Sequence, residues 1–453
     1  MHTQPPGPQE RIPAELRRLE DLVSPYGLVS RTAPLPVREG EPPFAVQLAH
    51  LGVPSRALPN LRTWAHDSDT GNSDGAGTGL TAERARLLAI AEALERYSTC
   101  AWNDDELLVA SEDELARGDE EFASPSRWPR CSPAELAMDD CRLAAYDPAV
   151  PIRWTRAWSL TRQVPILVPA IAVHLHMPYF SESEKFVRGI TTGAAVHSDV
   201  RAAVLGGLQE VIERDSIALT WLQRLRLPEL VVDPARLDAG TRELHRVGTS
   251  TDLRVRIFDA TTDFGVPVLY AVQLADADPQ LAQVVAATCD VRPEQALGKI
   301  YRELTSLRVA LRGYLAAYEG RTPEDAEVSV VGGAVFNGTP ERRPVFDFLL
   351  AGERASYGIE GLPGLPDGAD PLDTVVSRLA ERGAEVLVAD ITTDEARQVG
   401  MRAVKVLVPE AMPVSFVHRE RFLGTPRLYE APRAMGHPSH PEADVNPERQ
   451  PFA

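Results

Sequence analysis

The feature that most constrains this chain is a charged five-residue pattern, Glu-x-x-Glu-Arg, which occurs twice in segments with helical spacing. The copies are Glu92-Ala93-Leu94-Glu95-Arg96 and Glu210-Val211-Ile212-Glu213-Arg214. Side chains three or four residues apart lie on one face of a helix, so each copy presents two carboxylates and a guanidinium along a single face. One copy alone is most often a solvated helix surface. Two copies suggest instead that both helices contribute to one site. The surrounding sequence decides between a solvated surface and a shared site.

The helix that carries the first copy begins after Thr81, a suitable N-cap residue. Apolar residues at Leu87, Ile90, Ala91 and Leu94 form the stripe that we expect to be buried. The charged pattern then lies on the adjacent face.

The helix that carries the second copy starts at Ser198 or Asp199, either of which can serve as its cap. Its expected core stripe is Val200, Val204, Leu208 and Val211. Gly206 and Gly207 lie inside this helix, where each glycine costs about 1 kcal/mol relative to alanine. A helix tolerates such residues where another backbone packs closely, so we expect this helix to be central.

Two segments, one before the first helix and one between the two helices, are predicted to be irregular. Residues 67–79 are rich in Asp, Asn and Gly and are predicted to form a flexible loop before the first helix. Such a loop can cradle a phosphate with its amides, or it can be a mobile linker. Residues 102–150 are acidic and turn-rich, which indicates an excursion between core elements.

The rest of the chain alternates strand and helix patterns, which predicts an α/β protein with mixed sheets. A tail rich in Pro and polar residues starts at Gly436 and is expected to be an extended arm. The expected strands are within 152–176 and at 253–258, 266–274, 385–390 and 403–408, and the expected helices are 293–318, 372–382 and 394–400.

Composition excludes several classes of protein. Across 453 residues, Lys and Arg total 47 against 65 Asp and Glu, so a formal charge of -18 argues against binding to DNA or RNA. The four cysteines form no Cys-x-x-Cys pair, which argues against a structural zinc site and a disulfide framework. No apolar run reaches the roughly 18 residues that span a bilayer, and no signal peptide is evident, so we expect a cytoplasmic protein.

With these landmarks assembled, the chain resembles the YcaO superfamily, most closely the azoline-forming cyclodehydratases (D-protein type) of thiazole/oxazole-modified ribosomal peptide biosynthesis. The resemblance runs from about residue 66 to the end of the chain. It rests on Gly79-Leu80-Thr81 with Ala91-Glu92-Ala93-Leu94-Glu95-Arg96-Tyr97-Ser98, on Gly207-Leu208-Gln209-Glu210-Val211-Ile212-Glu213-Arg214-Asp215, on Asp390-Ile391-Thr392-Thr393, and on Arg427-Leu428-Tyr429-Glu430-Ala431-Pro432.

The resemblance implies a YcaO-like fold with mixed sheets flanked by helices and a nucleotide pocket between the two Glu-rich helices. It also implies three regions: an N-terminal extension and start of the fold at 1–65, a YcaO domain at 66–435 and a Pro-containing C-terminal arm at 436–453. ATP and Mg2+ are the implied cofactors. The implied metal ligands are Glu92, Glu95, Glu210 and Glu213, and the implied nucleotide-binding residues are Arg96, Arg214, Glu303 and Arg308.

In the family, a side chain of the substrate peptide attacks the preceding amide carbonyl. ATP then phosphorylates the hemiorthoamide oxygen, and phosphate leaves as the azoline forms. The resemblance therefore implies an ATP-dependent subunit that converts Cys, Ser or Thr of a ribosomally made precursor peptide into thiazoline or oxazoline. No residue is assigned a direct catalytic role.

Several positions depart from the family pattern. Polar or charged family residues are replaced by Thr78, Leu88, Ser198, Ala202 and Ser306, and two prolines of the C-terminal arm by Arg449 and Ala453, while Pro447 and Pro451 are kept. These departures motivate a second hypothesis, a non-catalytic scaffold or regulatory subunit with a degenerate ATP site. A third is a related YcaO enzyme that forms a thioamide or an amidine, against which the segment Arg427 to Pro432 argues.

The partners that the resemblance implies are a precursor peptide and a protein that binds its leader. Because the residues before 66 are too few for the family's peptide-clamp domain, we expect a separate leader-binding partner of the ubiquitin-activating-enzyme-like or ocin-ThiF type. An azoline dehydrogenase and a homodimer are further expectations, whereas nucleic acid and membrane are not expected as partners.

Overall fold

Three β-sheets and the helices between them make up the computed structural model, which describes residues 12–51, 58, 74–317, 331–366 and 368–453. The sheets have three, five and six strands, and every strand pair is antiparallel except β8 with β12. The mixed α/β class expected from the sequence is therefore confirmed. Among the described residues, no helix combines the length and hydropathy needed to cross a bilayer. The four cysteines are free thiols, as expected.

The three-stranded sheet packs on the helix that carries the first charged pattern, α3 (Ala82–Cys100). Its strands are β1 (Arg31–Leu35), β2 (Ala45–His50) and β3 (Gly75–Gly79). A Cβ on Gly75 or Gly77 would collide with the backbone of α3, so these glycines let strand and helix lie in direct contact. The prediction of a loop over 67–79 was wrong for 75–79, because the glycines serve packing. Residues 67–73 lie outside the described residues.

Helix α3 begins as expected, since the Thr81 side chain accepts a hydrogen bond from the Arg84 amide. Leu87, Ile90 and Leu94 are buried, and Ala91 is partly buried against the same core. Strands β1 and β2 precede residue 66; β1 pairs with β2 and β2 pairs with β3, so the N-terminal region contributes to the sheet. The region boundaries at 65 and 435 stay predictions.

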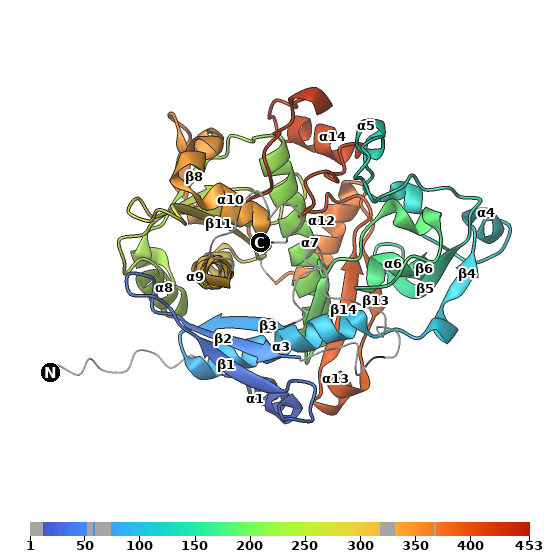
Figure 1. Ribbon diagram of the computed structural model, residues 1–453, viewed down its shortest axis with the longest axis horizontal. Helices are drawn as coiled ribbons and strands as arrows, with labels where there is room; N and C mark the ends of the chain where they lie inside the picture. Colours follow the sequence, from blue (N-terminus) through green and yellow to red (C-terminus); the bar gives the residue numbers. More distant parts are fainter. Residues whose placement is uncertain (1–11, 52–57, 59–73, 318–330, 367) are drawn as a thin grey trace.

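The second charged pattern lies on α7 (Val200–Leu222), which passes between the other two sheets (Figure 1). Asp199, rather than Ser198, caps this helix by accepting from the Ala202 amide. A Cβ on Gly207 would lie 2.5 Å from the Gly193 carbonyl oxygen, which confirms close backbone packing. Val204, Leu208 and Val211 are buried, but Val200 is 50% exposed. Placing Val200 in the core was wrong, because the first turn of α7 lies at the surface.

On one side of α7 lies the five-stranded sheet, covered by α8 and α9 (Figure 1). The sheet order is β11-β10-β9-β8-β12. The elements of this side are β8 (Glu229–Val231), α8 (Ala239–Gly248), β9 (Arg254–Asp259), β10 (Val268–Leu274), β11 (Gln283–Cys289), α9 (Pro293–Ala317), α10 (Gly332–Gly338), α11 (Asp347–Leu350) and β12 (Ser356–Gly358).

On the other side lies the six-stranded sheet, in which β4-β5-β13-β14-β7 form a path and β6 pairs with β5. Residues 102–150 contribute one of its strands, so this segment is part of the core architecture as well as an excursion. The elements are β4 (Leu108–Ala110), α4 (Glu112–Leu115), α5 (Pro133–Leu136), β5 (Ile152–Ser159), β6 (Val164–Pro169), α6 (Ala170–Val173), β7 (Ala194–His197), α12 (Pro371–Glu381), β13 (Leu387–Asp390), α13 (Asp394–Gln398), β14 (Arg402–Leu407) and α14 (Arg427–Ala434).

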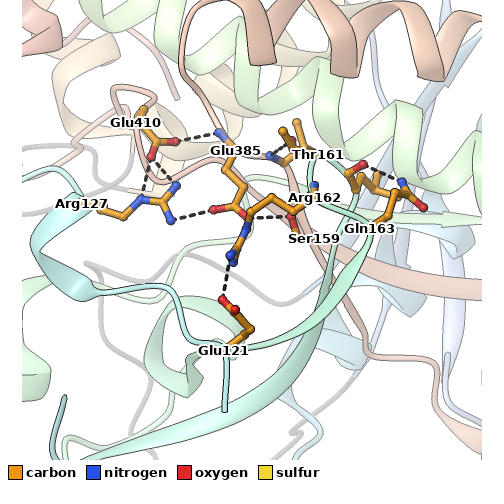
Figure 2. A network of polar contacts seen from close by, with 10 residues as sticks. Glu121, Arg127, Ser159, Thr161, Arg162, Gln163, Glu385 and Glu410 are labelled. Atoms are coloured by element: carbon orange, nitrogen blue, oxygen red, sulfur yellow. Dashed lines mark hydrogen bonds and ion pairs between the residues drawn. The ribbon is translucent and has the colours of Figure 1, made fainter. Parts of the chain in front are cut away.

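A polar network joins this excursion to the sheet (Figure 2). The Glu385 carboxylate, just before β13, accepts from Arg127 at 2.7 Å, from Arg162 at 2.6 Å and from the Ser159 hydroxyl at 2.6 Å. Burial alone would raise the pKa of Glu385, but these hydrogen bonds have the larger effect, so its pKa is lowered overall. Glu385 thus ties segments far apart in sequence to one another.

The C-terminal arm runs alongside α7 and packs into the fold. The Trp221 indole donates to the Glu448 carbonyl at 3.1 Å, and the Asn337 side chain donates to the Arg449 carbonyl at 2.8 Å. Phe452 is buried and meets the Tyr270 ring edge-on, with ring centroids 5.2 Å apart. Apart from a short 3-10 turn at Glu442–Asp444, the arm has no helix or strand, as expected.

Candidate functional site

Two adjoining cavities lie between α7 and α9. The smaller, of about 260 Å3, is bounded by α7, β11, α9 and the last two residues of the chain. The larger, of about 940 Å3, extends toward α8 and the start of α3. Gly206, Gln209 and Lys299 line both cavities. The smaller cavity is lined by Gly206, Gln209, Glu210, Glu213, Arg214, Ala286, Ala287, Thr288, Cys289, Lys299, Glu303, Leu307, Phe452 and Ala453.

On α3, Glu92 and Arg96 are held next to β3. The Glu92 carboxylate accepts from the Ala76 amide at 2.9 Å and from Arg96 at 2.6 Å. Arg96 also donates to the Asp74 carbonyl at 2.6 Å. The close packing of β3 on α3 therefore fixes one carboxylate and one guanidinium of the first pattern.

On α7, the two glutamates of the second pattern are each held by a backbone amide. Glu210 accepts from the Gly193 amide at 2.9 Å, and Glu213 accepts from the Cys289 amide at 3.0 Å. Arg214 lies 3.3 Å from Glu210 and 3.6 Å from Glu213. The second pattern is thus anchored to β11 on one side and to the start of β7 on the other.

The glutamates of the two patterns and Glu303 of α9 form one interacting set of carboxylates. Burial raises the pKa of Glu95, and the charges of Glu210 and Glu92 raise it further. Burial raises the pKa of Glu213 to about 7; Arg214 opposes this shift, and Glu210 and Glu303 add to it. The three helices therefore place five carboxylates where their charges repel.

Glu303 shows how this environment works. Glu303 is exposed, yet burial raises its pKa, and the charge of Glu92 raises it further. Exposure and a raised pKa are compatible because Glu303 lines the smaller cavity. A carboxylate in such a place is poorly solvated and favours a bound cation.

Two lysines near the carboxylates were not predicted from the sequence. Lys299 on α9 lines both cavities and pairs with Asp290 at 2.8 Å. Lys405 on β14 is buried; burial lowers its pKa to about 8, against the opposing charges of Glu210 and Glu95. A signal existed for each: Lys299 lies one helical turn before Glu303, and Lys405 interrupts an apolar strand.

Arg308, which is predicted to bind the nucleotide, lines neither cavity, and its assignment stays a prediction. Arg308 is 1% exposed and donates to Gln273 at 2.7 Å and to Asp278 at 3.1 Å. Its Nε and Nη1 are therefore occupied by contacts to β10 and the turn after it, whereas its buried Nη2 has no hydrogen-bond partner among the described residues.

The positions that depart from the family pattern fall into different surroundings. The buried Thr78 hydroxyl has no hydrogen-bond partner within the described part of the chain. Ala202 lines the larger cavity, whereas Ser198 is exposed and Leu88 and Ser306 are half-buried. Two of the five replacements thus have a visible local effect: Thr78 leaves an unpaired hydroxyl, and Ala202 leaves an apolar position in the cavity wall.

The donor set fits Mg2+ bound together with phosphate. Among the described residues, no three potential ligands converge on one point. Glu92, Glu210 and Glu213 are each held by a backbone amide of a different segment. Mg2+ usually takes one or two protein carboxylates and fills its other positions with water and phosphate oxygens. Oxygen donors on facing helices beside a cavity of this size meet that requirement.

Comparisons with known proteins agree with this chemistry. A family model described as YcaO cyclodehydratase, ATP- and Mg2+-binding, matches residues 76–412. An uncharacterized protein of Methanothermobacter thermautotrophicus is 30% identical over 271 residues, which are 58% of this chain and 63% of that protein.

Solved structures show the same fold. A heterocyclase in complex with substrate and cofactor has a TM-score of 0.76 and 23% identity, over 99% of this chain and 58% of that one. YcaO from Methanopyrus kandleri, bound with AMPPCP and Mg2+, has a TM-score of 0.56 and 20% identity, over 84% and 86%. This chain spans less than two-thirds of the length of the archaeal relative and of the heterocyclase.

Proposed function

Because this chain belongs to the YcaO cyclodehydratase family, we propose that it is an ATP-dependent cyclodehydratase subunit. Its substrates are Cys, Ser or Thr residues of a ribosomally made precursor peptide, which become thiazoline or oxazoline. The observation that carries the proposal is the set of five carboxylates on α3, α7 and α9, of which Glu210, Glu213 and Glu303 line a cavity of about 260 Å3. Mg2+ with a nucleotide would offset the repulsion among these carboxylates.

The chain's own residues would hold the nucleotide through its metal ions. Glu92, Glu95, Glu210 and Glu213 offer carboxylate oxygens from two helices, and Glu303 adds one from a third. Arg96 and Arg214 hold these carboxylates in place and offer donors for phosphate oxygens. Bound Mg-ATP would supply the phosphoryl group that carries the amide oxygen away as phosphate.

Positioning and charge stabilisation provide most of the catalysis in phosphoryl transfer. The parts of this site are already held by backbone amides at Ala76, Gly193 and Cys289, so little reorganisation is needed when the metal binds. Phe452 and Ala453 line one end of the smaller cavity, where they limit the access of water. The larger cavity leaves room for the peptide.

The second candidate is a non-catalytic YcaO-like scaffold or regulatory subunit. The observation in its favour is that Ala202 lines the larger cavity and that the Thr78 hydroxyl is unpaired where the family has longer polar residues. Fewer side-chain donors would weaken nucleotide binding by roughly 1 kcal/mol for each lost hydrogen bond. The raised pKa values of Glu95, Glu213 and Glu303 argue against loss of the site, because a scaffold gains nothing from crowding carboxylates together.

The reaction tests the proposal against the scaffold. The full chain, its leader-binding partner and the precursor peptide are incubated with Mg-ATP, and mass spectrometry counts the waters lost. Glu210→Gln is expected to abolish both ATP hydrolysis and water loss. Glu83→Gln is the matched control, since Glu83 lies on α3 but pairs with Arg17 at the surface. Full modification by a complex that carries Glu210→Gln would favour the scaffold.

A further inference from the structure

Lys405 is a buried cation near the carboxylate set. It lies on β14, paired with Ala389 of β13 and Ala194 of β7, and is 1% exposed. A lysine is almost never fully buried unless its charge is matched, because removing an ammonium from water is costly. The anionic side chains that act on Lys405 are Glu210 of α7 and Glu95 of α3, one from each charged pattern.

The Lys405 ammonium contacts the loop that holds Glu210. Its Nζ donates to the Ile190 carbonyl oxygen. Three residues later, the Gly193 amide donates to the Glu210 carboxylate at 2.9 Å. One short segment, 190–193, therefore links the lysine to a proposed metal ligand.

The end of this loop is fixed by its own backbone. Gly193 has a φ of +86°, and its carbonyl accepts from the Val406 amide at 2.7 Å. A Cβ at this position would collide with the Val406 carbonyl, so only glycine fits. The loop is thus held at Gly193 by β14 and at Ile190 by Lys405, which leaves the Gly193 amide pointing at Glu210.

We propose that Lys405 is a positioning residue that orients Glu210, and with it the Mg-nucleotide site, through the loop 190–193. This inference rests on the proposed function, because Glu210 is a metal ligand only if Mg-nucleotide binds. Loss of the lysine removes the donor from the Ile190 carbonyl, at a half-buried position, and frees the loop. Outer partners of metal ligands typically change metal affinity by about 10- to 100-fold when they are removed.

The test is calorimetric titration of the full chain with AMPPCP and Mg2+. We expect Lys405→Met to weaken binding by about 10- to 100-fold and Lys405→Arg, which keeps charge and donors, to restore most of it. Leu407→Ala is the matched control, because Leu407 is a buried residue of the same strand and packs in an apolar cluster without these carboxylates. It should lower the melting temperature and leave the Kd unchanged.

A second readout separates positioning from general stability. If Lys405 acts through Glu210, Lys405→Met should weaken binding much less in a Glu210→Gln background than in the wild type. If Lys405→Met does not fold, Lys405→Gln replaces it: its amide keeps a donor but is one bond shorter than the lysine side chain, so it reaches the Ile190 carbonyl less well and is expected to weaken binding in the same direction.

Three results overturn the inference: unchanged binding by Lys405→Met, tighter binding, which would make the lysine a competing charge, or equal losses in both backgrounds. Failure of the wild type to bind Mg-AMPPCP would instead overturn the proposed function.

Discussion

Glu213 is the residue whose protonation should be most visible in solution. Its pKa is raised from 4.5 to about 7, chiefly by burial. Between these values the folded protein holds a proton that the unfolded chain has released, so stability of the metal-free protein falls as pH rises through this window. Mg2+ competes with that proton, and its affinity therefore rises through the same window.

The measurement is thermal unfolding across pH with and without Mg2+. We expect the metal-free melting temperature to decrease toward pH 7 and added Mg2+ to offset the decrease. Glu213→Gln should flatten the metal-free profile in part, with Glu95 and Glu303 still contributing, whereas the surface variant Glu83→Gln should not. A wild-type profile that rises over this range would contradict the assignment.

Arg427 provides the residue-scale test of stability. It donates to Asp215 at 2.6 and 2.7 Å and to Asp263 at 2.8 Å, and Asp215 is fully buried. Removing one partner of a buried pair leaves an uncompensated charge, so Arg427→Met should lower the free energy of unfolding by about 3–5 kcal/mol. Arg201→Met breaks exposed pairs and should cost less than about 1 kcal/mol in the same urea titration. Similar losses for both variants would contradict this account.

At the scale of elements, the contact of β3 with α3 positions Glu92. Gly77→Val should strain this contact, because its Cβ would collide with the Ala85 carbonyl. We expect reduced stability and weaker Mg-nucleotide binding, since the neighbouring Ala76 amide holds Glu92. Gly313→Ala is the control, because nothing lies near Gly313 on α9 and alanine favours the helix by about 1 kcal/mol. Unchanged nucleotide binding by a folded Gly77→Val would contradict the role of this contact.

The same elements show what sequence patterns can and cannot predict. Periodicity located α3 and α7 with their caps and most of their buried stripes, because caps and apolar spacing are local signals. The glycines of β3 were misread as a loop. Glycine is needed there because α3, which follows in the sequence, packs directly on this strand. Val200 was misplaced for a similar reason: the apolar spacing of α7 extends into its first turn, but Val200 lies at the surface there.

At the scale of the whole molecule, the site depends on contacts between distant segments. The pairing of β14 with β7 places Lys405 near the carboxylates, and the C-terminal arm brings Phe452 to the end of the cavity. Neither follows from a local pattern. Glu303 and the two charged patterns, which the sequence singles out, interact in the structure. Arg308 contacts β10 instead, because helical position alone does not say which neighbour a side chain meets.

The arm provides a test at this scale. Phe452→Ala removes a buried ring that packs against Tyr270, and we expect a loss of about 3–5 kcal/mol in the free energy of unfolding. Because Phe452 also lines the smaller cavity, the variant should admit water and lower the yield of ring formation per ATP hydrolysed. Arg433→Ala, at an exposed position of α14, is the control. An unchanged yield from a folded Phe452→Ala protein would mean that the arm does not enclose the site.

The central claim is that five carboxylates on three helices form a site for Mg2+ and a nucleotide. Calorimetric titration of AMPPCP into the full chain, with and without Mg2+, tests it most directly. The account predicts binding that requires Mg2+, is strongly weakened but still measurable in Glu210→Gln and is unchanged in Glu83→Gln. No detectable binding at millimolar nucleotide, or binding indifferent to both Mg2+ and Glu210, would contradict it.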